Sequence, residues 1–199
     1  MILDLFRYFS QFPRKEGVLS IFSNGGSPYN SYSDLKGYVS SLPDNSYIPG
    51  ISSFVFGQSF DSVKARIDNL TGTYLFIDYG EFTSGRDNRN NIQDHQKVAA
   101  TIAVKVADSS DLVEEAIASE TTLILINELR ANLIYDSERG CVPWLNRGAI
   151  SEVDIVPFVA KELKSIGWTL MFSTDASDLF SIKKLMKSFI RLLNPIKFV

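Results

Sequence analysis

The only histidine and the only cysteine are the side chains of this sequence most often used in catalysis. A serine or cysteine nucleophile normally needs a base, usually histidine, and no Gly-x-Ser-x-Gly motif surrounds any serine. His95 lies in the polar segment SGRDNRNNIQDHQK (84–97), and we interpret it as a solvated loop histidine. Cys141 precedes Val-Pro-Trp without an acid–base partner nearby, and we interpret it as a small buried side chain. We therefore predict no catalytic residue and expect that the protein is not an enzyme.

Groups that bind metals or phosphates are present, but without the spacing that such sites need. Asp87, Asp94 and His95 share one segment, yet no HxH, HExxH, CxxC or EF-hand pattern accompanies them. We expect these carboxylates to be solvated. The turn Asn24-Gly25-Gly26-Ser27 lacks both the Lys-Ser/Thr of a P-loop and the third glycine of a dinucleotide-binding turn. We interpret it as a flexible turn, and we predict no metal site and no cofactor.

Composition excludes several classes of protein. The net charge of −3 argues against nucleic acid or anionic membrane binding over the whole surface, and one cysteine cannot form an internal disulfide. The stretch 1–17 has Asp4 and Arg7 inside its apolar part, which is untypical of a signal peptide, so we expect a short amphipathic helix there. No apolar run approaches the ~20 residues of a membrane span. We predict a single domain over 1–199, made in a cytoplasm and not inserted in a membrane.

The first third of the sequence predicts short elements around one long irregular insertion. Residues 23–53 are rich in Asn, Gly, Ser, Pro and Tyr. A loop of this length is uncommon inside a compact domain and is usually functional or ordered by a partner. The patterns predict a helix over 1–12, a strand over 17–22, a short helix over 34–41 within the insertion, a strand over 54–57 and a helix over 59–70.

The middle of the sequence predicts a long hairpin and a long helix. Residues 73–82 (TYLFIDYGEF) and 98–107 (VAATIAVKVA) are rich in β-branched and aromatic side chains, which is typical of strands. The polar segment 84–97 between them predicts a hairpin tip that leaves the body of the domain. Asp111 opens a helix to about Tyr135 whose centre, TTLILINEL, is apolar nearly all round. We expect the sheet and a neighbouring subunit to cover that helix on different sides.

The last third completes an α+β pattern. A loop over 137–149 precedes a strand over 150–160, in which Pro157 is awkward for a central position. A strand over 167–174 follows, and then a last helix, capped by Asp175 or Ser177 and stopped by Pro195. The order of elements predicts an α+β fold: a mixed or antiparallel sheet with a long polar hairpin, packed by a long central helix and terminal helices.

Two basic surfaces are candidates for contact with partners. The last helix places Lys183, Lys187 and Arg191 in one row, which suits nucleic acid, an acidic partner or anionic lipid. The alternative is a solvated outer face that complements the helix dipole. The hairpin tip is either an inter-subunit arm or a disordered loop. The interface candidates are therefore Arg86, Arg89, Ile92, Lys97, Lys183, Lys187 and Arg191.

The passage from TYLFIDYGEF (73–82) through KVAATIAVKVA (97–107) and the helix 111–135 to GWTLMFST (167–174) resembles the tail-terminator and head–tail joining proteins of tailed bacteriophages. The likeness lies in the order of elements over about half of the chain. It implies a structural ring subunit of the virion neck or tail around the DNA channel. Its partners would be copies of itself and other neck or tail proteins, with DNA close by. The alternative is a small intracellular ligand-binding or regulatory module whose irregular loops hold a ligand.

Overall fold

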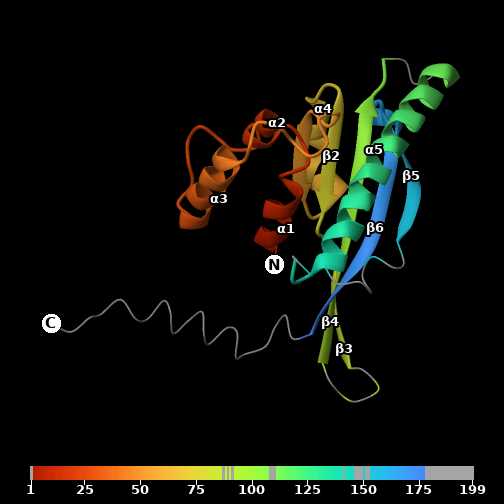
Figure 1. Cartoon of the computed structure of the whole chain (residues 1–199). Coiled ribbons are helices and arrows are strands. Elements are labelled where there is room, and N and C mark those ends of the chain that lie inside the picture. Colours follow the sequence, from red (N-terminus) through yellow and green to blue (C-terminus); the bar gives the residue numbers. More distant parts are fainter. Residues whose placement is uncertain are drawn as a thin grey trace.

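One six-stranded mixed sheet with helices on both faces forms the protein (Figure 1). The structure, a computed structural model, describes residues 2–86, 88, 90, 92–107, 111–140, 142–145, 150 and 153–177. The predicted α+β class is confirmed. The described helices are α1 (Ile2–Phe9), α2 (Lys15–Leu19), α3 (Asn30–Ser41), α4 (Phe60–Asp68), α5 (Leu112–Arg139) and the 3₁₀ turn η1 (Lys161–Leu163). The strands are β1 (Ser53–Gly57), β2 (Thr73–Asp78), β3 (Phe82–Arg86), β4 (Ile92–Lys105), β5 (Asp154–Ala160) and β6 (Ser165–Ser177).

The strand order is β1-β2-β4-β6-β5, with β3 paired to the far end of β4. Strands β1 and β2 run parallel because α4 carries the chain back between them, and all other pairs are antiparallel. Strand β5 lies at one edge of the sheet, where Pro157 is tolerated because an edge strand pairs on one side only. The long β4 is the common partner of β2, β3 and β6.

The larger part of the core lies between the sheet and the helices α1 and α5. Alternation along β2 turns Leu75 and Ile77 toward this core. Asp111 caps α5, since its Oδ1 accepts hydrogen bonds from Val113 N at 2.9 Å and Glu114 N at 3.2 Å. The helix ends at Gly140, whose φ of 64° is favourable for glycine. Aromatic side chains of α1 and the turn after it fill the space under α5 with edge-to-face contacts; these are Phe6, Tyr8, Phe9 and Phe12.

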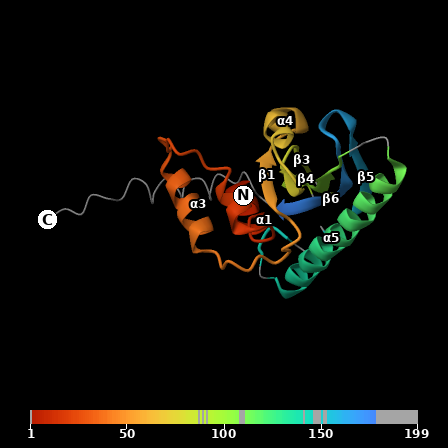
Figure 2. The ribbon, with the colours of Figure 1, turned by 90° about the horizontal axis from the view of Figure 1, so that it is seen from above.

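The opposite face of the sheet is covered only in part. Helix α4 lies on the far side of the sheet from α5, as Figure 2 shows. Its Ser59 cap accepts a hydrogen bond from Ser62 N at 3.3 Å, and Val63 and Ile67 pack on Tyr74 and Phe76 of β2. This cluster covers β1 and β2 and reaches η1, which leaves parts of β5 and β6 uncovered on this face.

The strand predicted over 17–22 is wrong, because Lys15–Leu19 is the helix α2. Short apolar runs such as GVLSIF do not distinguish a strand from a buried helical turn. The helix makes a close long-range contact: a Cβ on Gly17 would lie 2.0 Å from the Ser52 carbonyl oxygen. The helix therefore packs its backbone against the chain that enters β1.

Three further expectations need correction. Most of the predicted hairpin tip 84–97 is paired strand, and the insertion 23–53 contains the twelve-residue helix α3, longer than the predicted 34–41. Asp175 cannot cap a last helix, since β6 continues to Ser177. The remainder of that predicted helix lies outside the described residues, as does Cys141.

Candidate functional site

The interface candidates of the hairpin lie partly at its tip and partly at its base. Arg86 ends β3 directly opposite Ile92 of β4, and its Nη1 donates to Asn90 Oδ1 at 2.8 Å. Lys97 lies at the base, where its Nζ pairs with Glu81 Oε2 at 2.9 Å. Arg86 and Ile92 are thus paired across the hairpin, whereas Lys97 forms an ion pair with Glu81 of its own chain. Four other interface candidates lie outside the described residues: Arg89, Lys183, Lys187 and Arg191.

The base of the hairpin belongs to the body of the protein. Asp94 is buried, so the expectation of a solvated carboxylate is wrong. His95 is half-buried in β4 between Thr83 and Asp175, and it is not a loop residue. Buried Gln96 donates from Nε2 to the Tyr79 carbonyl oxygen at 3.0 Å. Strands β3 and β6 pair with this stretch of β4 on its two sides, and among the described strands only β3 is exposed along its whole length.

Helix α5 exposes an apolar row, which we call the α5 stripe: Val113, Ile117 and Ile124. Val113 is 68% exposed, and Ile117 and Ile124 are each 62% exposed. Residues spaced in this way share one side of a helix, while Ile126, Leu129 and other residues on the opposite side reach the core. The sheet therefore covers one side of α5, and no other described residue covers the stripe.

A second apolar area lies on the sheet face opposite α5, and we call it the sheet patch. It consists of Val156 of β5 and Met171 of β6, which are 37% and 39% exposed. The two are diagonal neighbours, because Val156 pairs with Thr169 two residues before Met171. Beside them the Thr101 and Thr169 hydroxyl oxygens lie 2.8 Å apart.

A pocket of about 260 Å³ opens between α1, the irregular insertion and the end of α5. In it the Tyr8 hydroxyl donates to Asp136 Oδ2 at 2.7 Å. Burial raises the pKa of Tyr8 far above its usual range, and the hydrogen bond to Asp136 and its charge act in the same direction. We call this the Tyr8 pocket; its lining residues are Tyr8, Gln11, Phe12, Tyr47, Asn132, Tyr135, Asp136 and Val142.

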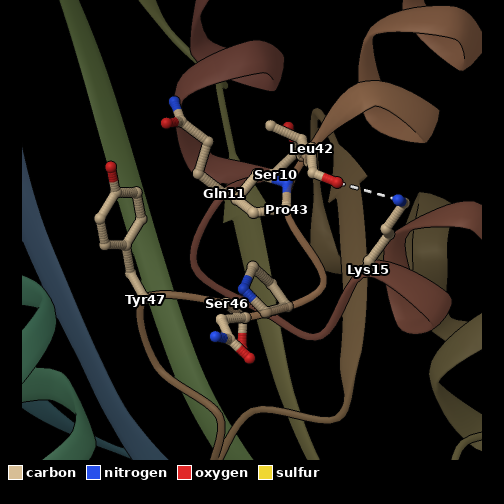
Figure 3. A pocket seen from close by; sticks show the side chains of 9 residues that line it. Ser10, Gln11, Lys15, Leu42, Pro43, Ser46 and Tyr47 are labelled. Carbon is tan, nitrogen blue, oxygen red and sulfur yellow. Dashed lines mark hydrogen bonds between the residues drawn. The ribbon is translucent and has the colours of Figure 1, made fainter.

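A smaller neighbouring cavity of about 50 Å³ shares Gln11 and Tyr47 with the Tyr8 pocket (Figure 3). Lys15 closes one side of it, donating from Nζ to the Leu42 carbonyl oxygen at 2.8 Å and pairing with Asp44 at 3.2 Å. This cavity holds little more than one or two water molecules.

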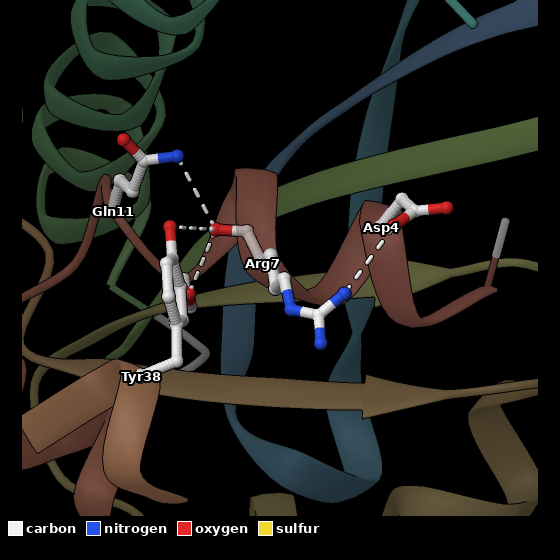
Figure 4. Close-up of polar contacts among 5 residues, drawn as sticks. Asp4, Arg7, Gln11 and Tyr38 are labelled. Atoms are coloured by element: carbon white, nitrogen blue, oxygen red, sulfur yellow. Dashed lines mark hydrogen bonds and ion pairs between the residues drawn. The ribbon is translucent and has the colours of Figure 1, made fainter. Parts of the chain in front are cut away.

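Gln11 lines both the Tyr8 pocket and the smaller cavity. Hydrogen bonds to the last turn of α1 fix its side chain (Figure 4). Its Nε2 donates to the carbonyl oxygens of Arg7 at 3.3 Å and Tyr8 at 3.4 Å. Tyr38 of α3 donates to the same Arg7 oxygen at 3.2 Å, which ties the insertion to α1. Sequence reasoning missed the Tyr8 pocket, because Tyr8 and Asp136 are 128 residues apart and belong to no motif.

Within the described ranges, no group of three or more His, Cys, Asp or Glu side chains is arranged to hold a metal ion. Among the helices that the structure describes, none is both long and apolar enough to cross a membrane. Comparison of the chain with protein-family models, with curated proteins and with solved structures finds no match in any of the three.

Proposed function

We propose that this chain is a non-enzymatic structural subunit of a bacteriophage neck or tail, joining copies of itself into a ring around the DNA channel of the virion. The observation that carries the proposal is the pair of exposed apolar areas on opposite sides of the molecule. The α5 stripe lies on the outer side of α5, and the sheet patch lies on the other face of the sheet. Exposed apolar side chains that lie together on one surface are candidates for contact with a partner.

Two different patches on opposite sides suit head-to-tail contact. A two-fold dimer uses one self-complementary patch, whereas a head-to-tail contact joins two unlike patches and closes into a ring when the rotation allows it. The α5 stripe of one subunit would meet the sheet patch of the next. The exposed strand β3 and the residues at its tip, Arg86 and Ile92, would reach a neighbouring subunit or layer.

Charge gives the contact a second component. Helix α5 carries six acidic side chains (Glu114, Glu115, Glu120, Glu128, Asp136 and Glu138) against two basic ones (Arg130 and Arg139). The basic row Lys183, Lys187 and Arg191 is of opposite sign, so it would suit an acidic neighbour such as α5 of another subunit as well as the DNA inside a ring.

The test is the oligomeric state of a variant with a charged α5 stripe. Wild-type protein at high concentration should form a closed oligomer by native mass spectrometry and light scattering. The double substitution Ile117→Glu and Ile124→Glu should give monomers with little change in melting temperature, because both side chains are exposed. The control pair Ser31→Glu and Ser33→Glu adds the same charge on exposed positions of α3 and should assemble normally. If both variants assemble like the wild type, the α5 stripe is not the ring contact.

The assignment to a bacteriophage has a separate test. Portal and capsid genes should flank the gene for this chain. A chromosomal neighbourhood of metabolic genes would favour the other candidate, a small ligand-binding or regulatory module. A specific observation favours that candidate: Tyr47 of the irregular insertion and Val142 of the second predicted loop both line the Tyr8 pocket.

A further inference from the structure

Asp136 is the one charged side chain among the residues that line the Tyr8 pocket. Asp136 is partly buried, and its hydrogen-bond partner in the described structure is the Tyr8 hydroxyl. No lysine or arginine is among the residues that line the pocket. A carboxylate that is partly removed from water interacts favourably with a cation placed beside it.

The walls of the pocket are aromatic. Phe12 and Tyr47 have their ring centroids 5.8 Å apart, and Tyr8 lies 5.3 Å from Phe12. The faces of aromatic rings attract cations, and sites that recognise quaternary ammonium groups surround them with such rings. One wall already makes this kind of contact, since the Arg139 guanidinium lies over the Tyr135 ring at 5.1 Å from its centroid.

The remaining polar groups supply acceptors. The amide nitrogen of Gln11 is committed to α1 carbonyl oxygens, and that of Asn132 donates to the Glu128 carbonyl oxygen at 2.9 Å. Each side chain therefore keeps its amide oxygen as the group available to a ligand. An ammonium group has three donors and no acceptor, which matches a carboxylate with two amide oxygens.

We propose that the Tyr8 pocket binds an alkylammonium group, with Asp136 as counter-ion and the rings of Phe12 and Tyr47 around the alkyl chain. The volume of about 260 Å³ lies below the ~300–1,000 Å³ of pockets for drug-sized ligands, so the guest has few heavy atoms. Anions are disfavoured by Asp136. A metal ion would find a single carboxylate, whereas calcium and magnesium need several oxygen ligands.

The same chemistry has two sources, a free amine and the side chain of a lysine. The probes are therefore n-butylammonium and N-acetyl-lysine-N-methylamide, titrated into the full chain and followed by NMR shifts of the Tyr8 and Tyr47 rings. n-Butanol and butyrate, of similar size, serve as neutral and anionic controls. Binding of both cations would show that the pocket accepts a lysine side chain of another protein as well as a free amine. Binding of butylammonium alone would restrict the pocket to free amines.

Asp136→Asn tests the counter-ion and keeps an acceptor oxygen for the Tyr8 hydroxyl. It should weaken butylammonium binding by at least about tenfold, the loss of a charge-assisted contact, while the melting temperature shows that the fold persists. Tyr47→Leu should weaken binding several-fold by removing an exposed ring. Asp154→Asn, at an exposed acid of β5, should leave binding unchanged. Equal affinity for butylammonium and butanol, or undiminished binding by Asp136→Asn, would overturn the proposal.

Discussion

Gly167 of β6 lies directly opposite Ala103 of β4, and the two strands approach so closely that no side chain fits on Gly167. A Cβ there would lie 2.0 Å from the Ile102 carbonyl oxygen and 2.6 Å from the Ala103 Cα. Both contacts involve backbone, which cannot rotate away as a side chain does. The glycine therefore sets how closely the two central strands pair.

Gly167→Ala should destabilise the protein. The strands must separate locally to admit the methyl group, which costs about 1–3 kcal/mol or more, as overpacking does. Urea denaturation measures the loss. The matched control is Gly85→Ala in the exposed strand β3, where a Cβ meets nothing within 4 Å. A Gly167→Ala variant as stable as the Gly85→Ala variant would contradict the packing described for this pair.

The pH dependence of stability should change when Tyr8 loses its hydroxyl. An unfolded tyrosine ionises near pH 10, whereas burial and the hydrogen bond to Asp136 raise the pKa of Tyr8 in the folded protein. Above about pH 10 the unfolded chain therefore releases a proton that the folded chain keeps, so the free energy of unfolding falls as the pH rises. Below that pH, this group contributes no slope.

Tyr8→Phe should accordingly flatten the fall in stability above about pH 10, measured by urea denaturation from pH 8 to 11. Some slope should remain, because burial also raises the pKa of Tyr74 and of Tyr38. At pH 7 the variant should lose about 1–3 kcal/mol through the missing hydrogen bond to a carboxylate. An alkaline slope identical to that of the wild type would show that Tyr8 ionises alike in both states.

Two replacements of different length should distinguish the role of the hairpin tip from that of its base. Replacing 87–91 by Asn-Gly joins Arg86 to Ile92 through a two-residue turn, and the melting temperature should change little. Replacing 85–96 instead removes buried Asp94 and Gln96 and unpairs the end of β6, so it should destabilise the fold. If the tip is an inter-subunit arm, the shorter replacement should fold and fail to assemble. Normal assembly of that variant would exclude the arm.

The basic row of the last predicted helix should act on assembly and not on folding. Changing Lys183, Lys187 and Arg191 to Gln should leave the melting temperature nearly unchanged, since exposed charges contribute little to stability. Association should become weaker and less dependent on salt, because three fewer charges are screened or paired. Sedimentation at several salt concentrations measures both effects. An unchanged salt dependence of association would indicate that the basic row is only a solvated face.

The elements that the sequence predicted well carry their own local signals. Helix α5 has a capping Asp111 and a long apolar pattern, and both agree with the structure. The predicted end at about Tyr135 lies four residues before the observed end at Arg139, although Gly140 is a stop signal in the sequence. The edge position of β5 likewise follows from Pro157.

The errors have long-range causes. Residues 93–97 are polar and predicted a hairpin tip, yet they pair with β3 and β6 as part of β4, and Asp94 and Gln96 are buried. The apolar run 17–22 predicted a strand, but Lys15–Leu19 is the helix α2, whose Gly17 lies against the Ser52 backbone. The Tyr8 pocket combines residues of 8–47 with residues of 132–142, which are far apart in the sequence, so no local pattern indicates it.

The position of β6 next to β4 also governs how quickly the protein reaches its native state. Thr101 and Thr169, which face each other in this pair, are 68 residues apart, and Gln96 and Thr174 are 78 apart. Closing such large loops costs chain entropy before any contact repays it, and domains dominated by distant pairings fold in milliseconds to seconds. Until β6 arrives, β4 exposes an unpaired edge to other newly made chains. The chain is most prone to aggregate during that interval.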